Sequence, residues 1–258
     1  MQKKGIKISS SLQSAYDEMY SDSMTEWREL CAKYKAENIE KICNGKLFSS
    51  VLECGAGEGS ILKFLEKNNF CDVLYATEIS ESGISQLKKR ALSKLVEIKK
   101  FDGYEIPYAD KKFDLVFCSH VLEHVEHPRI LLRELKRVSN YQAFEIPLDY
   151  SPCIDERAEH LFSYGHINVF TPATFKFLLK SEGFEILSER YTHMSPDVVE
   201  FNWYRNMGIK KSFLNDTKLK LIPIKRFLRN LRYLHLNKEI GYSAYTCLVK
   251  GNGQLSVF

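Results

Sequence analysis

Apolar and polar residues alternate in blocks along residues 46–191, and the blocks predict strands that alternate with helices. Apolar runs bounded by turn residues predict strands at Val51–Cys54, Val73–Glu78, Leu95–Lys100, Leu115–Ser119 and Tyr141–Ile146. Apolar residues at helical spacing predict helices at about 60–68, 83–92 and 128–138. Strands that alternate with helices form right-handed βαβ units, so we expect a parallel sheet with helices on both faces.

The pattern continues beyond residue 170 and is then interrupted. Thr171 and Pro172 have the residue types that begin a helix, and Gly183 is a plausible end for it. Two further strands are predicted at Phe184–Tyr191 and Ala244–Lys250, with about fifty residues between them. We therefore divide the chain into an N-terminal helical cap (1–45), a core (46–191), a helical basic insertion that acts as a lid or interface (192–243), and a final core strand with its tail (244–258).

Aromatic and aliphatic residues recur at helical spacing before the first strand. They are Tyr16, Tyr20, Met24, Trp27, Leu30 and Tyr34. This spacing predicts an amphipathic helix that packs on the core. The alternative is a cap that closes over a ligand cleft.

A glycine-rich stretch joins the first strand to the first helix. Glu53 is followed by Gly55, Gly57 and Gly59, so the pattern is E-x-G-x-G-x-G. Glycine allows a sharp turn and a close approach of ligand to backbone, and a helix start offers unpaired N–H groups. A dinucleotide fingerprint needs its third glycine one residue later, where this chain has Ser60, and this spacing excludes a nicotinamide enzyme. Glu53 favours a cationic ligand over a pyrophosphate.

In this motif the chain resembles the class I S-adenosylmethionine-dependent methyltransferases. The resemblance implies a Rossmann-like α/β fold with seven strands in the order 3-2-1-4-5-7-6, the last strand antiparallel. It also implies S-adenosylmethionine as cofactor, bound by Glu53 and by Gly55, Ala56, Gly57 and Gly59 of the turn. In this family an N-terminal aromatic helix often covers the methyl donor, which makes Tyr16, Tyr20 and Trp27 candidate contacts.

Further polar residues fall at the carboxyl ends of the predicted strands, where parallel sheets bind ligands. Glu78 lies nineteen residues after Gly59, the distance expected of a carboxylate that binds ribose hydroxyls. Ile79 is placed to pack against adenine. The resemblance assigns Asp102 and Gly103 to the adenine edge. Ser119 and His120 would lie beside the methionine part.

The segment Phe113–Val125 carries a second resemblance to the same family, because it begins F-D and ends V-L-E-H-V. His120, His124 and His127 also suggest a metal site. A zinc site needs three or four convergent ligands, and the chain has neither an HExxH motif nor a cysteine pair. We therefore predict no metal.

Three histidines are candidate catalytic groups for methyl transfer. His120, His160 and His166 lie in segments expected to face the cleft, near Asp149. A hydroxyl acceptor usually benefits from a general base, for which histidine is the commonest choice. We expect His166 or His120 to be that base or to orient the acceptor.

Composition indicates where the protein is located and which kinds of partner it needs. Its seven cysteines are scattered and odd in number, which argues for reduced thiols and a cytoplasmic location. No apolar run is long enough to cross a bilayer, so we expect no stable membrane insertion. The net charge of +4 does not demand nucleic acid. The sequence leaves open whether the protein forms a homodimer.

The positive charge is concentrated in the insertion. Residues 205–232 contain nine basic residues and one acidic residue, a local charge of +8. An anionic small-molecule acceptor, a membrane surface and RNA all fit such a segment. We favour the small molecule, because Pro223 interrupts a membrane-lying helix and no RNA-binding module is present.

The sequence thus predicts an S-adenosylmethionine-dependent methyltransferase. We expect it to O-methylate a small anionic or nucleotide- or sugar-linked metabolite, with bacterial surface-carbohydrate biosynthesis as one setting. The alternatives are N-methylation of an amino-sugar and a non-catalytic module that binds the cofactor or a partner.

Overall fold

The computed structural model describes residues 6–20, 24–149, 159, 161–162, 165–232 and 242–253. Its strands are β1 (Phe48–Cys54), β2 (Cys71–Glu78), β3 (Leu95–Lys100), β4 (Phe113–Ser119), β5 (Ser139–Pro147), β6 (Phe184–Thr192) and β7 (Ala244–Gly251). Its helices are α1 (Ser10–Met19), α2 (Thr25–Cys43), α3 (Ser60–Lys67), α4 (Glu81–Lys89), η2 (Leu122–His124), α5 (Pro128–Val138), α7 (Pro172–Ser181), α8 (Pro196–Phe201), η3 (Asn202–Asn206), α9 (Phe213–Lys220) and α10 (Ile222–Arg232).

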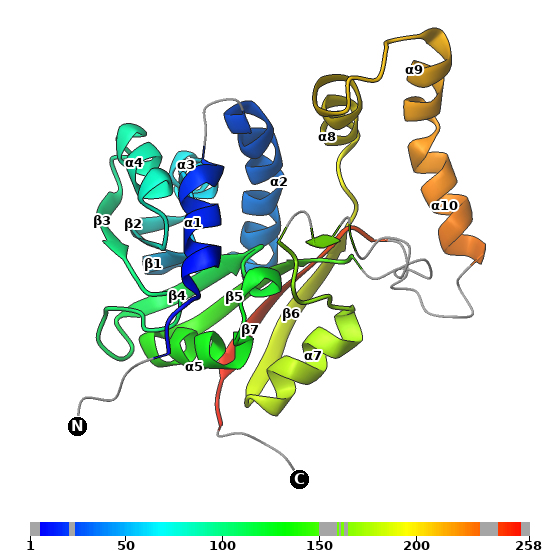
Figure 1. Cartoon of the computed structure of the whole chain (residues 1–258). Coiled ribbons are helices and arrows are strands. Elements are labelled where there is room, and N and C mark those ends of the chain that lie inside the picture. Colours follow the sequence, from blue (N-terminus) through cyan, green and yellow to red (C-terminus); the bar gives the residue numbers. More distant parts are fainter. Residues whose placement is uncertain are drawn as a thin grey trace.

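One seven-stranded sheet organises the chain, as Figure 1 shows. The strand order is β3-β2-β1-β4-β5-β7-β6, with β7 antiparallel to β5 and β6. This confirms the predicted Rossmann-like fold, including the strand order. The predicted strands are all present, with ends that differ by at most three residues.

Two apolar clusters fill the two faces of the sheet. One joins the strands to α5 and α7 through residues such as Leu131 and Phe175. The other joins them to α2, α3 and α4 through residues such as Ile39 and Leu62. Because both faces are covered, ligands can reach the sheet only at its ends.

Capping residues fix where the core helices begin. The Ser80 hydroxyl accepts a hydrogen bond from the Gly83 N–H, so α4 starts directly after β2. Thr171 and Thr174 form a capping box in front of Pro172, as the sequence predicted for α7.

The N-terminal region differs from the single helix predicted. It forms α1 and α2 as separate elements. Residues 21–23, between these two helices, lie outside the described residues. Helix α1 lies against the β2–α4 turn, whereas α2 packs against α3, β6 and β7.

Candidate functional site

The glycine turn is held in place by β2. The N–H groups of Gly55 and Ala56 both donate to the carbonyl of Thr77, at 2.9 and 3.0 Å. Gly55, Gly57 and Gly59 all have positive φ, between 53° and 76°. The predicted strand–turn–helix is therefore present, with its backbone pinned against the neighbouring strand.

All three glycines are needed because neighbouring side chains come close. A Cβ at Gly55 would lie 2.5 Å from Val121 Cγ2, and one at Gly57 would lie 2.7 Å from Tyr20 Oη. A side chain at Gly59 would overlap Leu87 of α4. Gly59 thus serves helix packing, while Gly55 and Gly57 keep the turn open to close approach.

Glu78 ends β2 and is buried directly beside the turn. Its Oε2 accepts a hydrogen bond from the Gly57 N–H at 2.7 Å, and its Oε1 accepts from the Ser80 N–H at 3.0 Å. Burial raises the pKa of this carboxyl and outweighs the hydrogen bonds that oppose the shift. The carboxyl is thus oriented, and it lines a cavity.

We call this hollow the first cavity. It is lined by Ile8, Tyr16, Tyr20, Gly55, Glu78, Ile79, Phe101, Gly103, Tyr104, His120, Val121, His124 and Val125. The sequence predicted seven of these residues. The apolar wall formed by Ile8, Phe101, Tyr104 and Val125 was missed, because nothing in the local pattern separates these residues from core residues.

Asp102 does not face the first cavity as predicted. Its Oδ1 accepts hydrogen bonds from the N–H groups of Tyr104 and Glu105, at 2.9 and 2.7 Å. The carboxylate therefore caps its own turn, which is the ordinary role of an Asp-Gly pair. Gly103 does line the cavity, and its φ of +93° leaves Ile8 in close contact.

Glu53 and Ser119 lie beneath the turn, and neither lines the first cavity. Glu53 is 3% exposed, and its Oε2 has no hydrogen-bond partner in the described part of the chain. Burial, helped by the charge of Glu78, raises the pKa of this carboxyl well above its ordinary value. The unpartnered oxygen is costly to bury, and a cationic group bound above it would favour the ionised form of this carboxyl.

His120 follows β4 in a left-handed conformation, with φ of +54°. Its Nδ1 lies 3.4 Å from Glu123 Oε1 and its Nε2 lies 3.3 Å from Glu145 Oε1. Burial and Lys35 act to lower the pKa of His120, but the two carboxylates outweigh them and raise it. The two carboxylates thus favour the imidazolium form of His120. Its left-handed backbone is strained for a non-glycine residue, and such strain is frequent at functional sites.

A second cavity begins at the same histidine. It is lined by Cys31, Tyr34, Lys35, Glu37, Asn38, His120, Glu145, Arg190, Thr192, His193, Met194, Ser195, Val198, Ser243 and Ala244. Among the residues that the structure describes, His120 alone lines both cavities. Lys35 and Arg190 bring positive charge into the second cavity, and Glu37 and Glu145 bring negative charge.

The sequence interpretation missed Glu145, which faces both His120 and the second cavity. It also accepts hydrogen bonds from Asn38 and Thr246, at 2.8 and 2.9 Å. A single carboxylate in the apolar run Ala143–Pro147 was the signal that could have identified it. Lys35 and Asn38 carry no comparable signal, because only the packing of α2 brings them here.

His166 pairs with a carboxylate near the first cavity. Its Nδ1 lies 2.6 Å from Asp149 Oδ2, and its ring centroid lies 4.8 Å from that of His124. His124 lines the first cavity, whereas His166 lines neither. His160, the third predicted catalytic histidine, lies outside the described residues.

Glu123, His124 and His166 also form a group with metal-ligating atoms, all within 4.8 Å of one another. Two imidazoles and a carboxylate are a common ligand set. The absence of a metal therefore stays a prediction.

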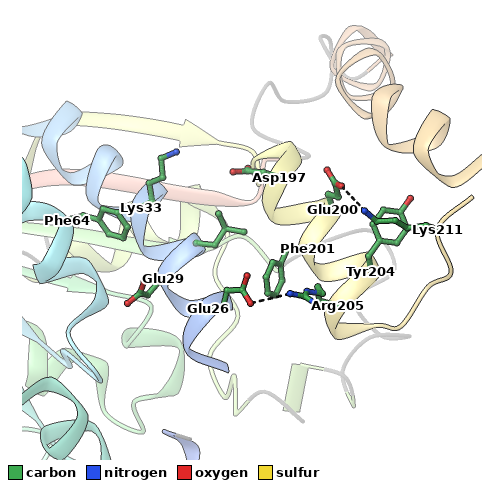
Figure 2. A pocket seen from close by; sticks show the side chains of 11 residues that line it. Glu26, Glu29, Lys33, Phe64, Asp197, Glu200, Phe201, Tyr204, Arg205 and Lys211 are labelled. Atoms are coloured by element: carbon green, nitrogen blue, oxygen red, sulfur yellow. Dashed lines mark ion pairs between the residues drawn. The ribbon is translucent and has the colours of Figure 1, made fainter. Parts of the chain in front are cut away.

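Trp27 was predicted to cover the donor, but it lines neither of these cavities. Its ring lies 5.7 Å from that of Phe201, because α2 turns this face toward α8. Figure 2 shows the groove between these helices, with ion pairs from Glu26 to Arg205 and from Glu200 to Lys211. The groove is where the insertion docks on the core, and none of the predicted site residues lines it.

Comparisons with known proteins agree with this arrangement. A sequence profile described as a methyltransferase domain matches residues 22–189. The chain is 28% identical over 156 residues to the sarcosine/dimethylglycine N-methyltransferase of Halorhodospira halochloris, covering 57% of this chain and 56% of that protein. It is 28% identical over 152 residues to the ubiquinone/menaquinone biosynthesis C-methyltransferase UbiE of Burkholderia orbicola, covering 57% and 61%. The chain thus spans a little over half of the length of these two relatives.

Solved structures show the same fold. Phosphoethanolamine N-methyltransferase 2 of Haemonchus contortus, in complex with S-adenosyl-L-methionine, superposes with a TM-score of 0.65 at 13% identity, over 97% of this chain and 61% of that one. A putative methyltransferase from the complex with the Haloferax volcanii Trm112 activator gives 0.65 at 10% identity, over 95% and 100%. At these identities the likeness establishes the fold alone.

Proposed function

The chain belongs to the class I S-adenosylmethionine-dependent methyltransferases, and from this premise we propose that it methylates a small acceptor that carries an anionic group. The observation that carries the proposal is the position of His120, which lines both cavities. The first cavity is the site for the donor and the second is the site for the acceptor. The methyl group would then pass beside His120.

The residues of the first cavity fit S-adenosylmethionine. Gly55 and Gly57 form a cradle that a Cβ would fill, and Glu78 presents a carboxyl at the end of β2. Below them Glu53 is a buried carboxylate with an unpartnered oxygen. Glu78 would accept from the ribose hydroxyls, Ile79 would pack against adenine, and Tyr16 and Tyr20 would cover the donor. When bound, S-adenosylmethionine supplies a methyl group on a positively charged sulfur.

Lys35 is the main support for an anionic acceptor. It projects from α2 into the second cavity, and its ammonium has no hydrogen bond or ion pair with any residue the structure describes. Arg190 lies in the same cavity. A carboxylate or phosphate on the acceptor would pair with these cations while its reacting oxygen lies beside His120.

We propose that the His166–Asp149 pair supports the site through His124, whose ring it contacts, because His166 itself lines neither cavity. The raised pKa of His120 favours its protonated form, which cannot take a proton from an acceptor hydroxyl. Its positive charge would instead hold the acceptor in place, because both ring nitrogens already face Glu123 and Glu145.

These roles suit O-methylation of a nucleotide- or sugar-linked metabolite, as in bacterial surface-carbohydrate biosynthesis. Cytoplasmic location goes with this proposal, as the scattered cysteines predicted. A second candidate is N-methylation of an amino-sugar. It is favoured by Glu145, which lines the second cavity, since a carboxylate there could accept a hydrogen bond from the N–H of a neutral amine acceptor.

A screen of metabolites for production of S-adenosylhomocysteine, followed by mass spectrometry of the product, tests the proposal. The decisive comparison uses pairs of acceptors that differ only in a hydroxyl or an amino group at one position. Turnover of an anionic hydroxyl compound is the expected result. Turnover of the amino member alone supports the second candidate, and binding of S-adenosylhomocysteine without any turnover supports a non-catalytic module.

A further inference from the structure

Helix α10 carries an apolar face that nothing in the described chain covers. Ile224, Phe227, Leu228 and Leu231 are 55%, 64%, 58% and 46% exposed. We call these four residues the α10 stripe. Their spacing of three and four places them on one side of the helix. In Figure 1, α9 and α10 stand apart from the sheet and its covering helices.

The same segment is strongly basic. Residues 218–232 contain six basic residues and no acidic residue, at Lys218, Lys220, Lys225, Arg226, Arg229 and Arg232. Helix α9 ends at Lys220 and α10 begins at Ile222, so the helical segment is interrupted beside Pro223, as the sequence suggested. Pro223 is the second residue of α10, where the missing N–H costs no hydrogen bond, and α10 itself continues past it. An uninterrupted apolar stripe is therefore combined with positive charge.

The combination of an apolar stripe with positive charge distinguishes between possible binding partners of α10. A second copy of the chain would bring six like charges against six. A soluble anion or RNA would use the charge but leave the four apolar side chains in water. A bilayer surface with anionic headgroups accepts both, because the stripe enters the acyl boundary and the basic side chains stay at the headgroups.

We propose that α10 binds the surface of an anionic membrane and holds the protein there. No helix in the described ranges is long and apolar enough to span a bilayer, so the attachment is peripheral. Arg226 Nη1 donates to the carbonyl of Met194 at 2.7 Å, and Met194 lines the second cavity. The membrane would therefore lie next to the proposed acceptor site.

Co-sedimentation of the full chain with vesicles tests this proposal. We expect binding to vesicles of phosphatidylcholine with phosphatidylglycerol, weak binding to phosphatidylcholine alone, and release at high salt. Replacing the stripe with Phe227→Ser and Leu228→Ser should weaken binding at least about tenfold. Phe177→Ser is the matched control, because Phe177 is 69% exposed on α7, and it should bind as wild type does.

The charge is tested in the same assay. Lys225→Gln should weaken binding roughly fivefold, the factor for one basic residue at an anionic surface. Lys180→Gln on α7 should have no effect. All variants should keep wild-type affinity for S-adenosylhomocysteine, which shows that they are folded.

Three results would overturn the proposal: wild-type protein that stays in the supernatant, equal binding to both vesicle types, or unchanged binding after the stripe is replaced. A dimer that dissociates in the Phe227→Ser, Leu228→Ser variant would assign the stripe to a subunit contact instead. Binding to RNA without binding to vesicles would assign the charge to nucleic acid.

Discussion

At the scale of single residues, His120 connects the chemistry of the site to the stability of the fold. It lies between the carboxylates of Glu123 and Glu145, which are both buried, and is itself half-buried. Burial acts to raise the pKa of each carboxyl, but the neighbouring imidazolium outweighs it and lowers both values. The three groups therefore depend on one another for their charge.

This dependence predicts a pH effect on stability. The pKa of His120 in the folded protein is raised above its ordinary value of 6.5. Its pairing therefore stabilises the fold fully below that value, and the stabilisation is lost as pH rises through the raised pKa. Urea unfolding at pH values near 6 and 9 measures this. His120→Asn should cost on the order of 3 kcal/mol at the lower pH, and less at the higher one.

His127→Asn is the control for His120, because His127 is exposed and belongs to the same segment. It should change the free energy of unfolding little at either pH. A cost for His120→Asn that is the same at both pH values would contradict the assigned imidazolium.

Gly57 provides a second test at this scale. In Gly57→Ala the new methyl group meets Tyr20 Oη at 2.7 Å, in a backbone with φ of +53°. We expect the strained backbone alone to lower the free energy of unfolding by about 1–2 kcal/mol. We also expect the affinity for S-adenosylhomocysteine to fall. Gly208→Ala has a similar φ of +64° but no atom within 4 Å of its Cβ, so it isolates the backbone cost. Equal ligand affinity in the two variants would remove the turn from the donor site.

The sequence predicts a site residue when the residue belongs to a local pattern, but it does not show whether the side chain is used elsewhere. Gly55, Gly57 and Glu78 belong to a local strand–turn–helix pattern, which the sequence displays directly. Asp102 has the same local signal, but its carboxylate is used by its own turn.

At the scale of elements, α2 contributes more to the site than its sequence indicates. The aromatic spacing drew attention to Trp27, which packs on α8. Five residues of α2 line the second cavity, among them Lys35 and Asn38, two and three turns further along. Their role depends on how α2 crosses the end of the sheet, and a local pattern contains no information on that crossing.

Lys35→Gln tests the part of α2 in acceptor binding. Loss of the ammonium should raise the KM for an anionic acceptor by about tenfold, since a charge-assisted contact contributes about 1.5–3 kcal/mol. The KM for S-adenosylmethionine should not change. Lys33→Gln, on the same helix but outside the second cavity, should leave both values unchanged. An unchanged acceptor KM in Lys35→Gln would show that Lys35 does not bind an anionic group of the acceptor.

The insertion is the element whose role the sequence left most open. Its helices were predicted, and α8, α9 and α10 are present. In the described ranges no residue between 205 and 232 lines the second cavity, although Arg226 contacts its rim at Met194. The structure thus provides no support for a lid made from the basic residues, and the apolar stripe gives α10 a different proposed role.

At the scale of the whole molecule, the sheet determines where all of this lies. Periodicity predicted the strands, but their order followed from the family resemblance and is confirmed. The order places β1, β2 and β4 side by side, so that Glu53, Glu78 and His120 meet at one edge. The antiparallel β7 places Thr246 beside Glu145, although the two residues lie far apart in the sequence.

The central claim is that the first cavity binds the methyl donor through the end of β2. Isothermal titration calorimetry with S-adenosylhomocysteine tests it most directly, on the wild type, Glu78→Ala and Glu81→Ala. Glu81 is the control, a carboxylate on the first turn of α4 whose side chain is 68% exposed.

We predict that Glu81→Ala binds as the wild type does. Glu78→Ala should bind at least about a hundredfold more weakly, since two hydrogen bonds to a carboxylate contribute about 3 kcal/mol or more. Equal affinity of Glu78→Ala and the wild type, with both proteins folded by circular dichroism, would contradict the account.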